Sequence, residues 1–198
     1  YWRDWSSDVC SSDLDLGMML LAWGPCAITV PSWAELLDAQ PDPAVVVDPV
    51  MRASIVSTRF AWRVRDRASG TEMLLVPPGT FRMGCEDVPV NPGDAECYSW
   101  EQPAHDCTLT HPFYMGRYEV TQAQWTQVMG SNPSRFQGET QFPGSAQRPV
   151  ERVSWAASQA YLAATGFRLP TEAEWEYACR AGATTALHAG PGFPSGSN

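Results

Sequence analysis

The chain has 198 residues, a hydrophobic share of 44% and a mean hydropathy of −0.26, values typical of a globular protein. Its formal charge is −9, and all 13 basic residues are arginine. The lack of lysine excludes a lysine Schiff base and a Walker-type phosphate lysine. The acidic balance, without an arginine stripe, excludes nucleic acid as an expected partner.

The first 47 residues are expected to lie outside the main domain. Residues 1–14 contain DVCSSDL, which is the translation of a common sequencing-library adapter, so we expect them to be an artefact. Residues 15–47 hold an apolar run, LGMMLLAW, followed by a linker rich in Pro and Asp. The run is shorter than the ~20 residues of a membrane span, so no transmembrane anchor is expected. It is either a signal peptide cleaved near Ala34, which favours export over the cytoplasm, or an ordinary buried segment.

Residues 48–71 are predicted to lead into the domain as a helix and the first strand of a hairpin. Asp48 as N-cap and Pro49 at the first helical position start a helix that runs to about Ser57. Arginines alternate with other side chains before an Ala-Ser-Gly turn, and an apolar run follows the turn. This pattern predicts a β-hairpin over residues 61–76. A short strand over 80–84 and an extended segment over 105–120, interrupted at a proline, are expected to follow.

Three more helices are predicted from their caps. Thr121 and Gln124 form a capping box, and a glycine at 130 ends that helix. The second runs over residues 154–165, with a serine cap and a terminal glycine. The third, 172–181, begins with a Thr-x-x-Glu capping box. A loop over residues 131–149 separates the first two and is too long to be an idle connection.

Four blocks of sequence resemble the formylglycine-generating-enzyme family of sulfatase-modifying factors. They read EMLLVPPGTFRMG, HPFYMGRYEVTQAQWTQVMGSNPSRF, RPVERVSWAAS and FRLPTEAEWEYACRAG, in that order along the chain. The resemblance covers residues 72–198 and implies an α+β, C-type-lectin-like fold with short strands, a few capped helices and much irregular chain. It also implies that these residues are the N-terminal part of the domain, truncated at the C-terminus.

The activity implied by the resemblance is oxidation of a sulfatase cysteine to formylglycine, with copper bound by a cysteine pair, which suits soft Cu(I). A sulfatase-like protein is then the expected substrate, and calcium is a further structural ion of the family. The family keeps its catalytic cysteines after the region matched here. We therefore expect no catalytic, cofactor-binding or metal-binding residue in this chain, and no oxidase activity of its own.

We interpret the residues of the matching blocks as having a structural role rather than a catalytic one. Trp175, Ala178 and Cys179 would form an inward stripe on the last helix. Glu176 would pair with Arg180 at i+4, and Arg168 would offer its guanidinium to a nearby carboxylate, Glu119 or Glu172. The scaffold signature of the blocks is Glu119, Trp125, Trp155, Arg168, Glu172, Trp175 and Glu176.

The cysteines and histidines leave alternatives open. Cys85 and Cys97 bracket a polar loop and would form a disulfide in an exported protein, or stay free thiols in a cytosolic one. Cys179 is either a small buried residue or the partner of a cysteine further along. His105, Cys107 and His111 share one face of a strand, but the two histidines are too far apart for one ion unless the chain bends.

Two other functions compete with the oxidase. One is a relative of the non-haem iron sulfoxide synthases of ergothioneine biosynthesis, although residues 16–71 do not resemble their His-rich helical domain. The other is a non-catalytic, lectin-like module that binds a ligand or partner. The resemblance also implies that strands beyond the matched region complete the sheet, so we expect the helix faces of Trp125 and Trp175 to be partly uncovered and the isolated chain to fold poorly or aggregate.

Overall fold

The computed structural model describes residues 28–85 and 101–183. The predictions for residues 1–27, including the adapter sequence and the apolar run, and those for 86–100 and 184–198 lie outside the described residues. The described part forms a four-stranded antiparallel sheet, a separate two-stranded ribbon and a set of short helices. The strand order in the larger sheet is β1-β2-β3-β6.

The strands of the larger sheet are β1 (Ala34–Asp38), β2 (Arg63–Asp66), β3 (Glu72–Val76) and β6 (Phe113–Gly116). The ribbon consists of β4 (Gly79–Met83) and β5 (His105–Leu109). β3 pairs with β6, and β4, which follows β3, pairs with β5, which precedes β6. The ribbon therefore continues the β3–β6 pair beyond a break in each strand. Prolines lie at both breaks, at 77–78 and 112, where they cannot donate ladder hydrogen bonds.

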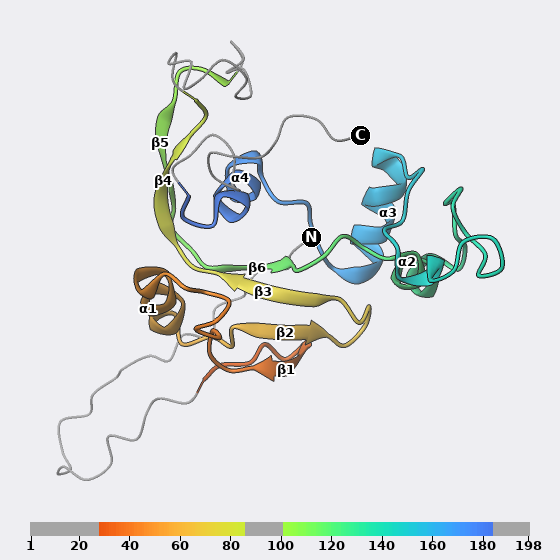
Figure 1. Ribbon diagram of the computed structural model, residues 1–198, viewed down its shortest axis with the longest axis horizontal. Helices are drawn as coiled ribbons and strands as arrows, with labels where there is room; N and C mark the ends of the chain where they lie inside the picture. Colours follow the sequence, from red (N-terminus) through yellow and green to blue (C-terminus); the bar gives the residue numbers. More distant parts are fainter. Residues whose placement is uncertain (1–27, 86–100, 184–198) are drawn as a thin grey trace, which may run out of the picture.

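The helices are α1 (Pro49–Ser57), α2 (Gln122–Met129), α3 (Trp155–Thr165) and α4 (Glu172–Arg180), with a short 3-10 helix, η2 (Ser145–Gln147). α4 lies in the angle between the ribbon and the sheet, and α2 and α3 lie together beyond the opposite end of the sheet (Figure 1). No helix in the described ranges is long and apolar enough to cross a bilayer.

The predicted caps are confirmed. Asp48 accepts a hydrogen bond from Val50 N at 2.9 Å at the start of α1. Both capping boxes are present, at Thr121 for α2 and at Thr171 for α4. Gly130 and Gly166 end α2 and α3 with φ of 74° and 71°, in the left-handed region that glycine adopts without strain.

The predicted hairpin over residues 61–76 is also confirmed. Trp62, Val64 and Asp66 face the core. Asp66 is fully buried and closes the turn by accepting hydrogen bonds from the backbone N and the hydroxyl of Ser69, at 2.7 and 2.8 Å. The opposite face of β2 carries Arg63 and Arg65, which pair with carboxylates on neighbouring strands.

Strand β1 was not expected, because residues 15–47 were assigned to a possible signal peptide and a linker outside the main domain. It pairs antiparallel with β2, and Ala34 is buried. Trp33, just before it, packs edge-on against Tyr114 with ring centroids 5.7 Å apart. The hydroxyl of Tyr114 donates to Ala61 O at 2.5 Å, and burial raises the pKa of this phenol well above its usual value. Residues before Glu35 therefore contribute to the core of the sheet.

The inward face of α4 differs from the prediction. Trp175 is 56% exposed and Cys179 is exposed, whereas Tyr177 is buried. The ring of Tyr177 packs against Phe81 on β4, with centroids 5.3 Å apart. It fits there because Gly79 has no side chain: a Cβ at this position would lie 2.2 Å from the Tyr177 hydroxyl. The glycine of the Pro-Pro-Gly block thus selects which stripe of α4 is buried.

Candidate functional site

Arg168 is held by a carboxylate that was not the predicted one. Its two terminal nitrogens donate to the two oxygens of Glu174, both at 3.0 Å, in a bidentate pair. We expected Glu119 or Glu172 instead. Glu174 serves twice, because the same carboxylate accepts from Thr171 N at 2.7 Å to complete the capping box. The segment before α4 is therefore fixed to the first turn of the helix.

Glu176 and Arg180 clamp the end of strand β4. The predicted i+4 pair is present, with Arg180 Nη2 and Nε at 2.6 and 2.8 Å from Glu176 Oε1. The same oxygen accepts from Gly84 N at 3.0 Å, and Arg180 Nη2 donates to Gly84 O at 3.1 Å. Both backbone groups of Gly84 are thus bonded by one helix, which fixes the chain immediately before Cys85.

Replacing Glu176 with alanine should destabilise this clamp. The change removes an ionised acceptor from Gly84 N and the ion pair between Glu176 and Arg180, so we expect a loss of about 1.5–3 kcal/mol in the free energy of unfolding. Urea titration would measure it. Glu172→Gln on the same helix is the matched control, because Glu172 is exposed, and should change stability by no more than about 0.5 kcal/mol. Equal losses in the two variants would contradict the clamp.

The other signature residues do not converge on one site. Trp125 is buried on α2 as expected, where it stacks on Tyr161 of α3 with ring centroids 5.0 Å apart. Trp155 is 73% exposed at the start of α3, and Trp175 is exposed on α4. Glu119 and Glu172 are exposed and have no ion pair among residues 28–85 and 101–183. The signature therefore divides into core, clamp and surface residues.

The long loop over residues 131–149 is built around one buried amide. Gln122 in the first turn of α2 is 2% exposed, and its Nε2 donates to Phe136 O at 3.1 Å and to Pro149 O at 3.5 Å. Its Oε1 accepts from Asn132 Nδ2 at 2.9 Å. A single side chain thus bonds to the beginning, the middle and the end of the loop. Nothing in the sequence marked this residue, since a glutamine next to a capping threonine is ordinarily solvent-exposed.

Two glutamates complete the bracing of the loop. Glu139 caps η2, because its carboxylate accepts from Gly144 N at 2.7 Å, Ala146 N at 3.3 Å and Ser145 Oγ at 3.2 Å. Glu151 accepts from two further backbone amides, Arg135 N and Phe136 N, the latter at 3.0 Å. Neither glutamate was predicted. The only available signal was the length of the loop, which indicated that something must hold it.

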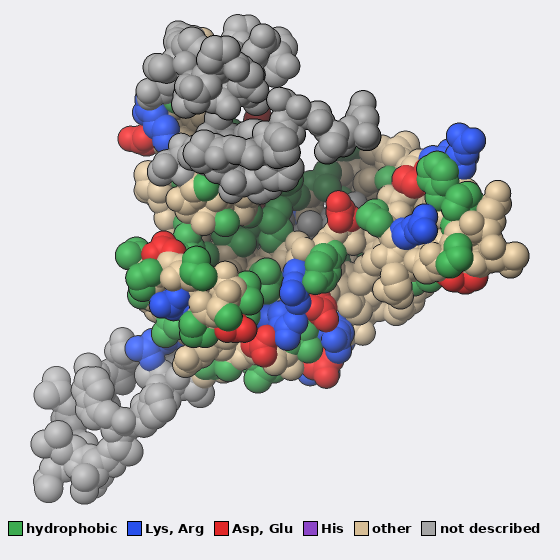
Figure 2. All heavy atoms as spheres, in the orientation of Figure 1, with side chains coloured by type: hydrophobic (Ala, Val, Ile, Leu, Met, Phe, Trp, Pro, Cys, Tyr) green, Lys and Arg blue, Asp and Glu red, His purple; other side chains and the backbone are tan. Residues whose placement is uncertain are grey.

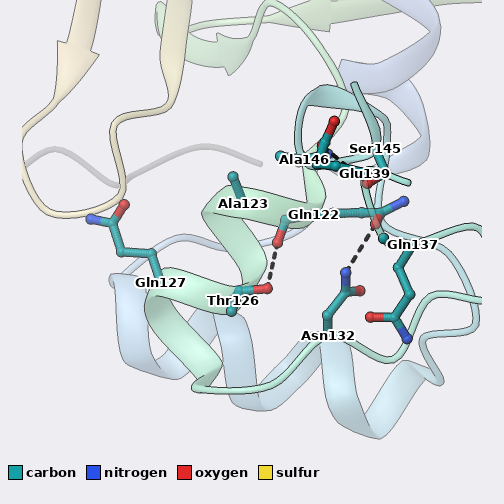
Figure 3. Close-up of a pocket in the computed structure, with 10 residues that line it drawn as sticks. Gln122, Ala123, Thr126, Gln127, Asn132, Gln137, Glu139, Ser145 and Ala146 are labelled. Carbon is teal, nitrogen blue, oxygen red and sulfur yellow. Dashed lines mark hydrogen bonds between the residues drawn. The ribbon is translucent and has the colours of Figure 1, made fainter. Parts of the chain in front are cut away.

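A depression of about 440 Å³ lies between α2 and this loop (Figure 3). It is lined by side chains of Gln122, Thr126, Asn132, Gln137 and Glu139, among others. Most of these polar groups already have hydrogen-bond partners in the loop or in α2, including Thr126 Oγ1, which donates to Gln122 O at 2.7 Å within the helix. One hydroxyl in it, Ser145 Oγ, lies 3.2 Å from the Glu139 carboxylate, but that carboxylate also accepts hydrogen bonds from two backbone amides, so the pair braces the loop.

The Glu139 cap predicts a pH dependence. Hydrogen bonds from the backbone amides of Gly144 and Ala146 lower the pKa of this carboxyl from 4.5, with smaller contributions from Ser145 and Arg148. A lowered folded-state pKa stabilises the fold above the unfolded pKa, and this contribution is lost as pH falls through the folded pKa. Wild type should therefore exceed Glu139→Gln in stability at pH 7, and the difference should vanish well below pH 4.5. A difference that urea titrations find constant with pH would contradict the cap.

The cysteines and histidines do not form a metal site in the described part of the chain. Cys107 on β5 and Cys179 on α4 are free thiols, and no group of three His, Cys, Asp or Glu side chains could hold an ion there. Cys85 is disulfide-bonded. Its partner lies outside the described residues, so the pairing with Cys97 stays a prediction.

Comparison with known proteins gives a consistent family. The chaperone protein LppX of Paenibacillus barcinonensis is 37% identical over 109 residues, covering 35% of this chain and 36% of LppX. The formylglycine-generating enzyme of Thermomonospora curvata is 30% identical over 160 residues, covering 59% of this chain and 51% of the enzyme. Hercynine oxygenase of Mycolicibacterium smegmatis is 30% identical over 147 residues, covering 58% of this chain and 32% of that protein.

This chain thus spans between about a third and a half of the length of these relatives. The model of the sulfatase-modifying factor enzyme 1-like domain matches residues 60–197, which is more than half of the chain. The match includes all four blocks that carry the caps, the Arg168–Glu174 pair and the Glu176 clamp. The chain belongs to the sulfatase-modifying factor enzyme 1-like, or formylglycine-generating-enzyme, domain family.

Proposed function

We propose that this chain is the N-terminal part of an oxidoreductase domain of the formylglycine-generating type, and that its role in that domain is to provide the scaffold. The best support is that residues of the family blocks form the contacts that hold α4 and β4 in place. In the described residues, Arg168 and Glu174 fix the start of α4, and Glu176 and Arg180 fix the end of β4. A sulfatase-like protein would be the substrate of the whole enzyme.

Copper, or calcium as a structural ion, does not fit the described residues. The two free thiols lie on different elements, β5 and α4, and no cluster of ligands accompanies either of them in the described ranges. In this proposal the metal-binding and catalytic residues belong to a part of the polypeptide outside these ranges. The described residues would act on the reaction only by holding the surfaces against which that part packs.

A chimaera tests the proposal. Residues 60–197 would replace the matching stretch of the Thermomonospora curvata enzyme, and the product would be assayed with Cu(I) on a Cys-x-Pro-x-Arg peptide. We expect formylglycine to form, and we expect less of it when the chimaera carries Glu176→Ala. This chain alone should give no product. A chimaera with the near-ultraviolet circular dichroism of the parent enzyme but no oxidation would contradict the proposal.

Two relatives support other roles for the same fold. The similarity to hercynine oxygenase supports an iron-dependent relative of the sulfoxide synthases, and the similarity to a protein named as a chaperone supports a non-catalytic binding module. The chimaera distinguishes these two alternatives from the oxidase. If residues 60–197 are adapted to either alternative, we expect the chimaera to fold but not to oxidise the peptide.

A further inference from the structure

Three exposed arginines lie in the loop over residues 131–149 or just after it, and none of them forms an ion pair within the described residues. Elsewhere in the described residues, six arginines pair with Asp or Glu, and Arg52, Arg59 and Arg67 do not; the six are Arg63, Arg65, Arg82, Arg117, Arg168 and Arg180. At the loop, Arg135, Arg148 and Arg152 are exposed and form no ion pair with any described residue, although the charge of Arg148 helps to lower the pKa of Glu139 and its Nη2 donates to Pro143 O at 3.3 Å. The two carboxylates present, Glu139 and Glu151, already accept hydrogen bonds from backbone amides.

Backbone hydrogen bonds bring these arginines together. Glu151, next to Arg152, accepts from the backbone N of Arg135, and its own N donates to Ser134 Oγ at 3.1 Å. Gln122 Nε2 reaches Phe136 O and Pro149 O, so the residue after Arg135 lies beside the residue after Arg148. Residues 134–136 and 148–152 therefore run side by side, with Arg135 on the first segment and Arg148 and Arg152 at the two ends of the second.

An exposed aromatic ring lies on the same surface. Phe136 is 46% exposed, with the Arg135 guanidinium 5.7 Å from its ring centroid. Phe142 packs edge-on against it at 5.4 Å. The part of the molecule beyond the sheet shows blue basic groups and some red acidic groups next to green hydrophobic groups (Figure 2). Arginine and aromatic residues on a fixed backbone are the residues that dominate binding energy in protein interfaces.

We propose that this surface, the arginine seam formed by Arg135, Phe136, Arg148 and Arg152, docks an acidic segment of a partner protein that carries an apolar side chain beside its carboxylates. Guanidinium groups match carboxylates in bidentate geometry, and the phenyl ring would receive the apolar side chain. A short acidic segment contacts only the seam. An anionic membrane would also face the rest of a chain with a net charge of −9, which would repel it.

The experiment uses the full chain, immobilised at low density to avoid self-association, with surface plasmon resonance as the readout. The probes are a twelve-residue peptide of repeated Glu-Glu-Leu, the same peptide with Gln for Glu, and vesicles containing phosphatidylserine. We expect binding of the Glu peptide alone, weakened by salt. Arg135→Glu with Arg148→Glu should weaken binding about tenfold, whereas Arg59→Glu with Arg67→Glu, exposed elsewhere, should change it less than about twofold.

A matched pair of glycine variants separates binding from folding. Arg152 and Arg59 are both exposed with φ near +60°, at 62° and 61°, a strained conformation for any residue but glycine. Both Arg152→Gly and Arg59→Gly should leave the melting temperature unchanged or higher, but only Arg152→Gly should weaken peptide binding, about threefold. Equal effects on binding would overturn the proposal, as would equal binding of the two peptides, binding to vesicles only, or no binding. None of these outcomes depends on oxidase activity.

Discussion

Trp125→Ala is expected to lower the free energy of unfolding by about 3–5 kcal/mol, the range for emptying a large aromatic site in a core. The side chain is 3% exposed and stacks on Tyr161 with the two rings 4° from parallel. Its removal would leave a cavity between α2 and α3, the two helices that carry the long loop. Urea unfolding followed by circular dichroism would measure the loss.

The control for this prediction is the same change at the two exposed tryptophans. Trp155→Ala and Trp175→Ala should each cost less than about 1 kcal/mol, because each side chain is more than half exposed in the described structure. A loss at Trp175 as large as that at Trp125 would show that the assignment of buried and exposed rings is wrong. We expected both the Trp125 and the Trp175 faces to be partly uncovered, and this is correct only for Trp175.

Gly79→Ala is the second change with a large expected effect. The φ of Gly79 is ordinary, so the cost is steric: the new Cβ would lie 2.2 Å from the Tyr177 hydroxyl and 3.0 Å from the ring carbon that bears it. We expect a loss of about 3 kcal/mol, near the upper end for overpacking a core. Thermal and urea unfolding would measure it.

A double variant tests the cause of this loss. Tyr177→Phe removes the atom closest to the new methyl group, so Gly79→Ala with Tyr177→Phe should recover part of the stability. Gly138→Ala serves as the comparison, because nothing lies within 4 Å of its Cβ position and only its φ of 92° opposes the change. That variant should lose about 1–2 kcal/mol, with no dependence on Tyr177. Identical behaviour of Gly79 and Gly138 would contradict the steric explanation.

Local rules made much of the fold predictable. A helix start depends on a few neighbouring residues, so Asp48, Thr121 and Thr171 were identified from sequence alone, and alternation identified the β2–β3 hairpin. The i+4 pair of Glu176 and Arg180 was predictable for the same reason. Each of these features requires only residues close together in the chain.

The misassigned features depend on residues far apart. Two stripes of α4 could have faced inward, and a glycine on β4 decides between Trp175 and Tyr177. The Arg168–Glu174 pair is an exception, because its residues are only six apart; there the capping box orients the carboxylate toward Arg168, which spacing alone does not reveal. Strand β1 is recognisable only through its partner β2.

The bonds of Gln122 make the loop between Phe136 and Pro149 a natural insertion point. Because one amide on α2 fixes both of these residues, the chain between them can change length without moving the helices on either side. Loop-closure entropy rises by only about 0.6 kcal/mol for each doubling of length. Thr140 and Gln141 are exposed. A foreign peptide could therefore be inserted between them and displayed on this fold while Phe136 and Pro149 stay in place.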